Sequence, residues 1–534
     1  MILFREFLSD IHCCLIAYAR LIKCHIRMFF YQNMAVFEFF FLTEFILGDK
    51  IISYKERGRI IKMENEKILH PQTEERHHDM SVEFSDQTNL IEQSAYRYSL
   101  QERAEPNLYR QLFDYESVPK TSFNHRFVPV NMPEDIWITD TTFRDGQQSM
   151  EPFSVEQICD LYTMMHRLGG PRGLIRQSEF FVYSEKDRRA VERCMELGYD
   201  FPEITTWIRA SKKDFELVKS LGIRETGVLV SCSDYHIYNK MGLTRRSALE
   251  KYTAVIREIM EMGIRPRCHF EDITRADFYG FVVPFTTELQ RISDEYGIPV
   301  KIRACDTMGY GVSYAGAALP RSVPGIIYGL MHYAGVPSEM LEWHGHNDFY
   351  KAVTNAATAW LYGCSSVNCT LLGIGERTGN CPLEAMVMEY ASLRGDNGGM
   401  DLPVITEIAE YFEHEIGYRI PPRTPFVGRN FNVTSAGIHA DGLNKDEEIY
   451  NIFNTERLLG RPATVAVNAH SGTAGIAHRL NSIYRGVETF DKHDPVIGKI
   501  YGMVKDEYET GRITNMSDDE LVAMLRTVRG ETEG

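Results

Sequence analysis

Residues 136–143 read IWITDTTF and begin the part of the chain that decides the fold. A short apolar and β-branched run followed by polar residues is typical of a buried strand. Similar runs recur further along the chain, and longer amphipathic stretches separate them, which is the pattern of a parallel sheet. The expected strands are 136–143, 173–181, 203–208, 226–232, 265–271, 299–305, 340–346 and 366–373.

The segments between these strands have helical spacing, as in residues 247–262, SALEKYTAVIREIMEM. Strands and helices in this alternation predict an α/β fold, a (β/α)8 TIM barrel, over residues 131–398. The alternation stops at about residue 400. Helical patterns and a short β segment at 464–468 predict a C-terminal, mainly helical accessory region at 399–534.

The N-terminal part of the chain differs in composition from the rest. Residues 1–62 are rich in Phe, Ile, Leu, Cys and Tyr, but charged residues such as Arg20 and Glu38 interrupt the apolar runs. None reaches the roughly 18 residues that span a bilayer, and a signal peptide fits poorly. We expect translation to start at Met63, with membrane attachment as the alternative. Residues 63–130 are polar and predict a solvated arm.

Composition excludes some classes of function. A formal net charge of −16 gives no electrostatic support for binding nucleic acid. The 11 cysteines are scattered and form no CxxC motif, which argues against a disulfide framework or a structural zinc site. This cysteine usage favours a reducing cytoplasm.

A pair of histidines closes the expected seventh strand, in the stretch WHGHND at 343–348. Residues two apart on a strand share a face, so His344 and His346 both point into the barrel mouth and can share one ion. An isolated His-x-His motif is more often structural than a metal site. Its position at the strand end, where TIM-barrel active sites lie, favours a ligand role.

The end of the first strand supplies charged groups beside these histidines. Residues 139–147 read TDTTFRDGQ and contain Arg144 and Asp145. An ordinary strand-end ion pair is the alternative interpretation.

A glycine-rich stretch, GIGERTGN at 373–380, follows the eighth strand. Gly373 and Gly375 let the backbone approach a ligand closely. The simpler interpretation is that these glycines only form a tight turn. Asn380 can offer its carbonyl oxygen to an ion. Two imidazoles, a carboxylate and an amide oxygen suit Mg, Mn, Zn or Co.

These three motifs, in this order and at these strand ends, resemble those of the metal-dependent acyl-CoA condensing enzymes and lyases, over roughly residues 134–485. The family includes 2-isopropylmalate synthase, homocitrate synthase, Re-type citrate synthase and 3-hydroxy-3-methylglutaryl-CoA lyase. The resemblance implies a Claisen-type condensation of acetyl-CoA with a 2-oxo acid, supported by one divalent metal ion. The implied metal ligands are Asp145, His344, His346 and, more weakly, Asn380.

Further motifs support the same resemblance, namely RCHFED at 267–272, DTMG at 306–309, AGIH at 436–439 and HSG at 470–472. The resemblance implies that Arg144 stabilises the developing oxyanion and that Glu271 is catalytic. Thr307 is expected to hold the carboxylate of the oxo acid. His439, helped by Tyr450 or Glu271, is expected to act as the general base. In the relatives this His and Tyr reach the barrel of the partner subunit, which implies a homodimer.

Residues on other strands indicate which 2-oxo acid is the acceptor. Arg267 matches an arginine near the substrate of homocitrate synthases, and a cation suits a dicarboxylic acceptor. Ser211 stands where homocitrate synthase has a pocket histidine, and RQSE at 176–179 also departs from the family pattern. We therefore expect the shorter oxaloacetate, with citrate as product and His269 binding the second carboxylate. 2-Oxoglutarate and 2-oxoisovalerate stay open.

Three other readings of the chain are weaker. Residues 140–149, DTTFRDGQQS, resemble a biotin-dependent carboxyltransferase motif, but that group has a carboxylated lysine ligand where this chain has Cys-Asp-Thr at 305–307. Acyl-CoA lyases lack the accessory region. A non-enzymatic scaffold does not explain the coincidence of motifs. The short tail after His470 leaves no room for a leucine-binding domain, so we expect no leucine feedback.

Overall fold

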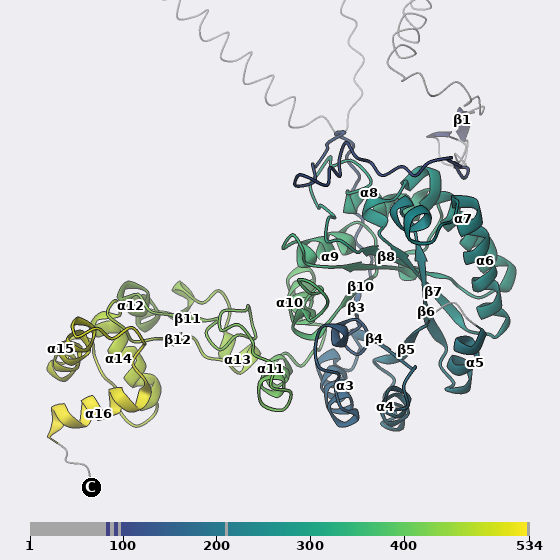
Figure 1. Cartoon of the computed structure of the whole chain (residues 1–534). Helices are drawn as coiled ribbons and strands as arrows, with labels where there is room; N and C mark the ends of the chain where they lie inside the picture. The colour runs from purple at the N-terminus through teal and green to yellow at the C-terminus, as the bar shows by residue number, and fades with distance from the viewer. Residues whose placement is uncertain (1–81, 86–89, 94–97, 209–211, 531–534) are drawn as a thin grey trace, which may run out of the picture. The chain divides into compact units, whose positions relative to one another are not determined.

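The computed structural model describes residues 82–85, 90–93, 98–208 and 212–530. Eight parallel strands close into a barrel in the order β10-β3-β4-β5-β6-β7-β8-β9 (Figure 1). The strands are β3 (Trp137–Asp140), β4 (Ile175–Phe180), β5 (Glu203–Ile208), β6 (Glu225–Ser231), β7 (Arg265–Glu271), β8 (Lys301–Asp306), β9 (Leu341–Gly345) and β10 (Ser366–Cys369). The predicted TIM barrel is confirmed. Residues 1–62, most of the arm before Tyr98, and Ser211 lie outside the described residues.

A helix follows each strand and covers the outside of the barrel (Figure 1). The helices are α3 (Val155–Gly169), α4 (Glu185–Glu196), α5 (Lys212–Ser220), α6 (Arg245–Glu261), α7 (Val283–Tyr296), α8 (Val323–His332), α9 (Ala352–Leu361) and α10 (Leu383–Arg394). Local signals set where they begin. At α3, the side chains of Ser154 and Gln157 each accept a hydrogen bond from the backbone N–H of the other, a capping box.

Two strands, β3 and β10, end three and four residues earlier than the sequence pattern predicts. The carboxylate of Asp140 accepts a hydrogen bond from the Thr142 N–H (3.0 Å), which turns the chain away from the sheet after β3. After β10, Leu372 adopts a φ of 56°, and its N–H donates to the Glu384 carboxylate (3.1 Å). Both departures occur at the mouth of the barrel, so the residues that follow belong to loops there.

The interior of the barrel is charged, whereas TIM barrels are usually filled with branched apolar side chains. The buried polar residues that bond across it are Gln177, Glu179, Glu225, Arg267, Lys301, Arg303 and Glu342. Acidic and basic groups alternate in this network, because a buried ion is stable only beside a partner of opposite charge.

The accessory region begins on the barrel and continues as a separately packed unit. Helix α11 (Val404–His414) shares the barrel core. The ring centroids of Phe412 in α11 and of Phe153, just before α3, lie 6.0 Å apart. Helix α13 (Thr455–Leu459) also shares the barrel core through Leu459, and the remaining elements have small cores of their own. They are β11 (Val433–Thr434), α12 (Gly437–Lys445), β12 (Thr464–Val465), α14 (Gly472–Ile483), α15 (Pro495–Glu509) and α16 (Asp518–Arg529). The mainly helical composition is as predicted, and the domain boundaries stay predictions.

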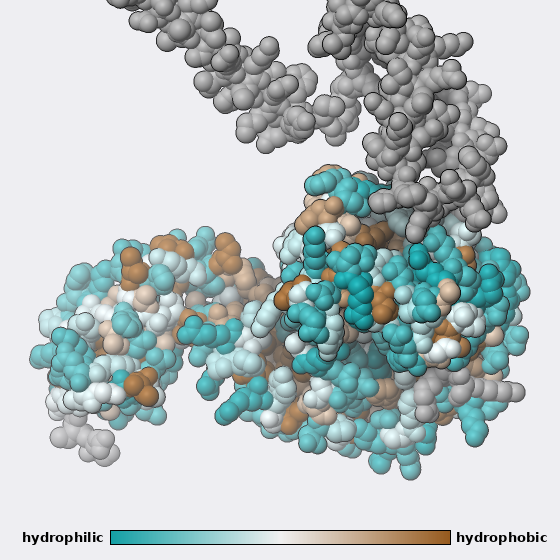
Figure 2. Space-filling view, turned by 45° about the horizontal axis from the view of Figure 1, so that its top comes forward, coloured by the Kyte–Doolittle hydropathy of each residue, from teal (hydrophilic) through white to brown (hydrophobic). Residues whose placement is uncertain are grey.

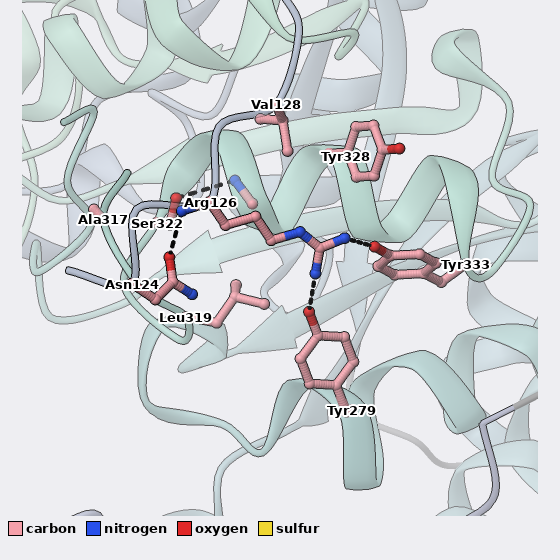
Figure 3. A pocket seen from close by; sticks show the side chains of 10 residues that line it. Asn124, Arg126, Val128, Tyr279, Ala317, Leu319, Ser322, Tyr328 and Tyr333 are labelled. Carbon is pink, nitrogen blue, oxygen red and sulfur yellow. Dashed lines mark hydrogen bonds between the residues drawn. The ribbon is translucent and has the colours of Figure 1, made fainter. Parts of the chain in front are cut away.

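The described part of the polar arm is anchored by Arg126 (Figure 3). Its guanidinium donates to the hydroxyl of Tyr279 (2.9 Å) and to that of Tyr333. The cavity around these side chains holds about 30 Å³, which is room for one water molecule. The contact therefore fastens the arm to the barrel and leaves no space for an organic ligand.

On the face shown in Figure 2, hydrophilic side chains predominate and hydrophobic ones are exposed in small, separate groups. Among the described residues, no helix is long and apolar enough to cross a membrane.

Candidate metal centre and active site

Three predicted ligands meet at the mouth of the barrel. Oδ2 of Asp145 lies 3.7 Å from Nε2 of His344 and 3.9 Å from Nε2 of His346. All three side chains are buried, and their ligand atoms lie within 4.8 Å of one another. One carboxylate and two imidazoles in this arrangement can surround a single ion and leave open positions for substrate.

Neighbouring groups prepare the histidines for that role. Nδ1 of His344 lies 2.8 Å from the side-chain oxygen Oδ1 of Asn368, whose Nδ2 donates to Thr139. His344 therefore donates from Nδ1 and keeps the lone pair of Nε2 for a ligand. Burial lowers the pKa of His344 to about 3 and also lowers the pKa of His346, so both rings are neutral near pH 7.

Asp145 is held as a carboxylate. Burial alone would raise its pKa, but the guanidinium of Arg144 and the two histidines hold the pKa below its usual range. Nη1 of Arg144 donates to Oδ1 (2.9 Å), and Nδ2 of Asn380 donates to Oδ2 (3.0 Å). The negative charge is therefore present before any ion arrives.

The glycine-rich loop brings Asn380 to this group. Gly379 has a φ of 89°, and a Cβ there would lie 2.2 Å from the carbonyl oxygen of Gly373. A Cβ at Gly375 would lie 2.5 Å from Nδ2 of Asn380. Within the described part of the chain, Oδ1 of Asn380 and Nδ1 of His346 are buried without a hydrogen-bond partner. An unpaired amide oxygen beside the carboxylate fits a further metal ligand.

Glu179 connects Arg144 to the barrel interior, a role that the sequence analysis missed. Its Oε2 accepts from Nε of Arg144 (2.8 Å), from the hydroxyl of Thr141 (2.9 Å) and from Nη1 of Arg303 (3.1 Å). A Cβ at Gly227 would lie 2.9 Å from its Oε1, so glycine makes room for this carboxylate. The Arg144 guanidinium is thus oriented from both ends.

The structure places Arg267 and His269 below the mouth. Arg267 is fully buried and donates to Glu225 (3.0 Å), to Glu179 and, through Nε, to His269 (3.4 Å). Each nitrogen of Arg267 therefore has a partner. Burial lowers the pKa of His269 to about 3, so His269 is a neutral acceptor. The substrate-binding roles of both residues stay predictions.

Glu271 ends β7 and is surrounded by groups that stabilise its charge. It accepts from the hydroxyl of Ser231, from Nδ1 of His236 (2.9 Å) and from Nζ of Lys240 (3.2 Å). Burial works against ionisation, but His236 and Ser231, followed by Lys240, lower the pKa of Glu271 to about 2. His236 and Lys240 lie in a π-helix, η2 (Tyr235–Lys240), a rare element common at functional sites. No periodicity in the sequence predicts it.

Thr307 joins three strand ends. Its hydroxyl accepts from the Asp272 N–H (2.8 Å), and its carbonyl oxygen accepts from Nη2 of Arg377 (2.6 Å). Nε of Arg377 also donates to Asp348 (2.9 Å). The glycine-rich loop is therefore tied to the ends of β7, β8 and β9.

A cavity of about 570 Å³ opens beside the glycine-rich loop. Gly373, Gly375 and Arg377 line it, and Tyr418 contributes from the C-terminal region. The loop residues that line it directly precede Asn380 in the sequence, and the four predicted metal ligands are not among the lining residues. Its size is in the range of small-molecule sites.

His439 and Tyr450 form a pair in the accessory region. Their ring centroids lie 4.4 Å apart, and Nδ1 of His439 is 3.2 Å from the Thr434 hydroxyl. Ile438 and Ile452 beside them are 74% and 96% exposed. Among the described residues, no hydrogen bond or ring contact joins this pair to the metal-ligand group. The barrel therefore assembles its ligands without them.

The sequence of the chain is similar to those of known proteins. The sequence profile described as HMGL-like matches residues 135–411. The chain belongs to this HMGL-like family. It is 55% identical to the Citrate (Re)-synthase of Clostridium kluyveri, over 83% of this chain and 98% of that one. It is 54% identical to the Citrate (Re)-synthase of Syntrophus aciditrophicus, over 81% of this chain and 69% of that one.

A third relative has a different name from the first two. The chain is 35% identical to the 2-phosphinomethylmalate synthase of Streptomyces hygroscopicus, over 82% of this chain and 99% of the relative. The family relationship inferred from the strand-end motifs is thus confirmed, and the matches run beyond the barrel into the accessory region.

Proposed function

We propose that this enzyme condenses acetyl-CoA with oxaloacetate and releases citrate and CoA. The observation that carries the proposal is the 55% and 54% identity to two proteins named Citrate (Re)-synthase. The buried ligand group at the mouth of the barrel supports it, because TIM-barrel enzymes build their active sites there. Other 2-oxo acids are the competing acceptors.

One divalent ion, Mg, Mn, Co or Zn, would be held by Asp145, His344 and His346, with Asn380 as a weaker fourth ligand. Neutral imidazoles, an ionised carboxylate and an unpaired amide oxygen support this assignment. When bound, such an ion polarises the ketone of the oxo acid as a Lewis acid. The rest of the chemistry belongs to the side chains.

Arg144 would stabilise the negative charge that develops on the former ketone oxygen. Its Nε is fixed by Glu179 and its Nη1 by Asp145, so the cation is oriented before the reaction begins. A fixed cation in a buried site stabilises an oxyanion with little reorganisation. Thr307 would hold the carboxylate that the oxo acid carries next to its ketone.

His439, helped by Tyr450 or by Glu271, would remove a proton from the methyl group of acetyl-CoA. The resulting enolate carbon attacks the ketone carbon, and water then cleaves the thioester to release CoA. We assign His439 to the barrel of the partner subunit in a homodimer. The exposed Ile438 and Ile452 support this, because apolar side chains gathered on a surface favour a contact.

Acetyl-CoA would enter through the cavity beside the glycine-rich loop. Gly373 and Gly375 lack side chains, so the backbone there can approach the thioester closely. We also propose a cytoplasmic location. The eight described cysteines are all free and buried, as in proteins of reducing compartments.

The test is release of free CoA thiol from acetyl-CoA by the purified protein with divalent metal. The acceptors are oxaloacetate, 2-oxoglutarate, 2-oxoisovalerate and pyruvate. We expect the highest kcat/KM with oxaloacetate, loss of the rate on chelation, and no inhibition by leucine. Turnover of 2-oxoisovalerate alone would keep the condensation and overturn the assigned acceptor. No thiol release with any acceptor would contradict the proposed function.

A further inference from the structure

Arg303 on β8 is a fully buried arginine with one unused nitrogen. Its Nε donates to Glu342 (2.5 Å) and its Nη1 to Glu179 (3.1 Å). Nη2 is buried and makes no hydrogen bond to any described residue. A buried donor that gives up water without gaining a partner is destabilising, and more so when it is charged. Such a group marks a place where a ligand atom can bind.

Arg303 stands in the middle of β8, close to the end of the barrel that carries the metal ligands. Cys305 lies opposite His344 in the β8–β9 register, so Arg303 is one inward-facing position below that level. Two other described arginines, Arg176 and Arg265, have a buried, unpaired nitrogen. Both stand at the opposite, N-terminal ends of their strands. Of these three donors, the one on Arg303 is nearest to the reacting groups.

Glu179 couples Arg303 to the group that would stabilise the oxyanion. One carboxylate oxygen, Oε2, accepts from Arg303 and from Arg144, and Arg144 in turn binds Asp145. Two guanidinium groups therefore share one carboxylate, and one of them also binds the metal ligand Asp145. Glu179 and Glu342 balance their charges, but Nη2 of Arg303 is still a charged donor for a carboxylate that enters from the mouth.

Arg267 is less suited to meet such a carboxylate. The β7–β8 register pairs His269 with Arg303 and Arg267 with Lys301, so Arg267 lies one inward-facing position deeper. Its nitrogens already bind Glu225, Glu179 and His269. Arg303 offers a free donor at the shallower level.

We infer that Nη2 of Arg303 binds the distal carboxylate of the acceptor and selects a four-carbon dicarboxylic oxo acid. The inference rests on the proposed function. With the ketone and first carboxylate held at the ligand group, the second carboxylate is two C–C bonds of about 1.5 Å each from the ketone carbon. This short reach matches the level of Arg303 rather than the deeper Arg267. A monocarboxylic acceptor has nothing to offer Nη2.

The experiment compares acceptor binding by wild type, R303Q, R303K and R176Q. Binding of oxaloacetate and of pyruvate to the metal-loaded protein is measured by calorimetry, and CoA thiol release is followed in parallel. We expect R303Q to weaken oxaloacetate binding about 10- to 100-fold, because one charge-assisted hydrogen bond is lost. The affinity for pyruvate should stay within about threefold of wild type. R303K should recover part of the loss. R176Q, which alters a similar arginine at the far end of the barrel, should bind both acids like wild type.

The variant R303Q removes the arginine that hydrogen-bonds Glu342, so R303Q/E342Q removes the buried pair together and is measured alongside. Equal losses for oxaloacetate and pyruvate in the folded variants, or unchanged oxaloacetate binding, overturn the inference and leave the proposed function intact. A wild-type protein that neither binds nor turns over oxaloacetate overturns the proposed function and the inference with it.

Discussion

The barrel and the C-terminal unit formed by residues 433–450 and 463–529 are built in different ways. The barrel has one continuous apolar core around its helices and a paired ion network inside its strands. The C-terminal unit has small separate cores, and its His439–Tyr450 pair lies among exposed apolar side chains. Groups that must hold an ion are fixed by strands, whereas the proposed proton-transfer pair is carried on a surface.

This difference separates binding from proton transfer. The ligand group is complete within the barrel, where Asp145, His344 and His346 are buried together. The proposed base belongs to a unit with its own core, so the two functions can be damaged independently.

The largest effect is expected from H344A. The substitution removes a ligand and leaves Oδ1 of Asn368 without its donor. We expect metal affinity to fall more than about 100-fold and thiol release to disappear, because ligand positions matter more than their supporting groups. Calorimetric metal titration checks this. H493Q, at an exposed histidine of the C-terminal unit, is the matched control. Wild-type affinity in H344A would remove His344 from the ligand group.

The next effect is expected from H439A. A general base contributes about 10²- to 10⁴-fold to a rate, so kcat should fall by that order while metal affinity stays that of wild type. Steady-state thiol release and metal titration of the same preparation separate the two. The conservative Y450F should lose less. If H439A keeps wild-type kcat, the accessory region does not supply the base.

A third substitution, L521A, acts on the core of the C-terminal unit. Leu521 is fully buried there, and truncating a buried leucine costs about 2–5 kcal/mol. We expect this unit to unfold at lower denaturant concentration while the barrel keeps its metal affinity. Ile513 is 96% exposed, and I513A is the control. A single joint transition with loss of metal binding would mean that the two regions form one cooperative unit.

The smallest effect concerns pH and Glu271. Its pKa is lowered to about 2 from an ordinary 4.5, because the hydrogen bonds from its neighbours outweigh burial. A depressed folded-state pKa stabilises the protein above the unfolded pKa, and this stability is lost as pH falls through the interval between the two values. Between about pH 6 and pH 4 the loss is about 1 kcal/mol.

The variant E271Q cannot titrate, so its difference from wild type in unfolding free energy should shrink by that amount over the same interval. Denaturant melts at several pH values measure it. A difference that does not vary with pH would show that the neighbours of Glu271 do not lower its pKa.

Much of the fold and the ligand group could be predicted because both depend on local pattern. Alternating strands and helices predict a barrel, and residues two apart on a strand share a face, which brought His344 and His346 together. The strand ends were less predictable. Asp140 ends β3 through a side-chain hydrogen bond that periodicity does not reveal.

The support of the site could not be predicted because it depends on contacts between distant strands. Glu179 and Arg303 are 124 residues apart and meet only through the register of the barrel. His236 reaches Glu271 because a π-helix turns it there. The partners of Arg267 likewise become visible only once the strands are aligned.

The most direct test of the account is complementation between subunits. H344A lacks a barrel ligand and H439A lacks the proposed base, so each alone should be inactive. If the accessory region of one subunit serves the barrel of the other, subunits unfolded and refolded as an equal mixture should regain about a quarter of the wild-type sites, because half of the dimers are mixed and each has one intact site. Recovered thiol release with oxaloacetate at that level is the predicted result. No recovery from mixtures shown to contain mixed dimers would contradict a base supplied across the dimer.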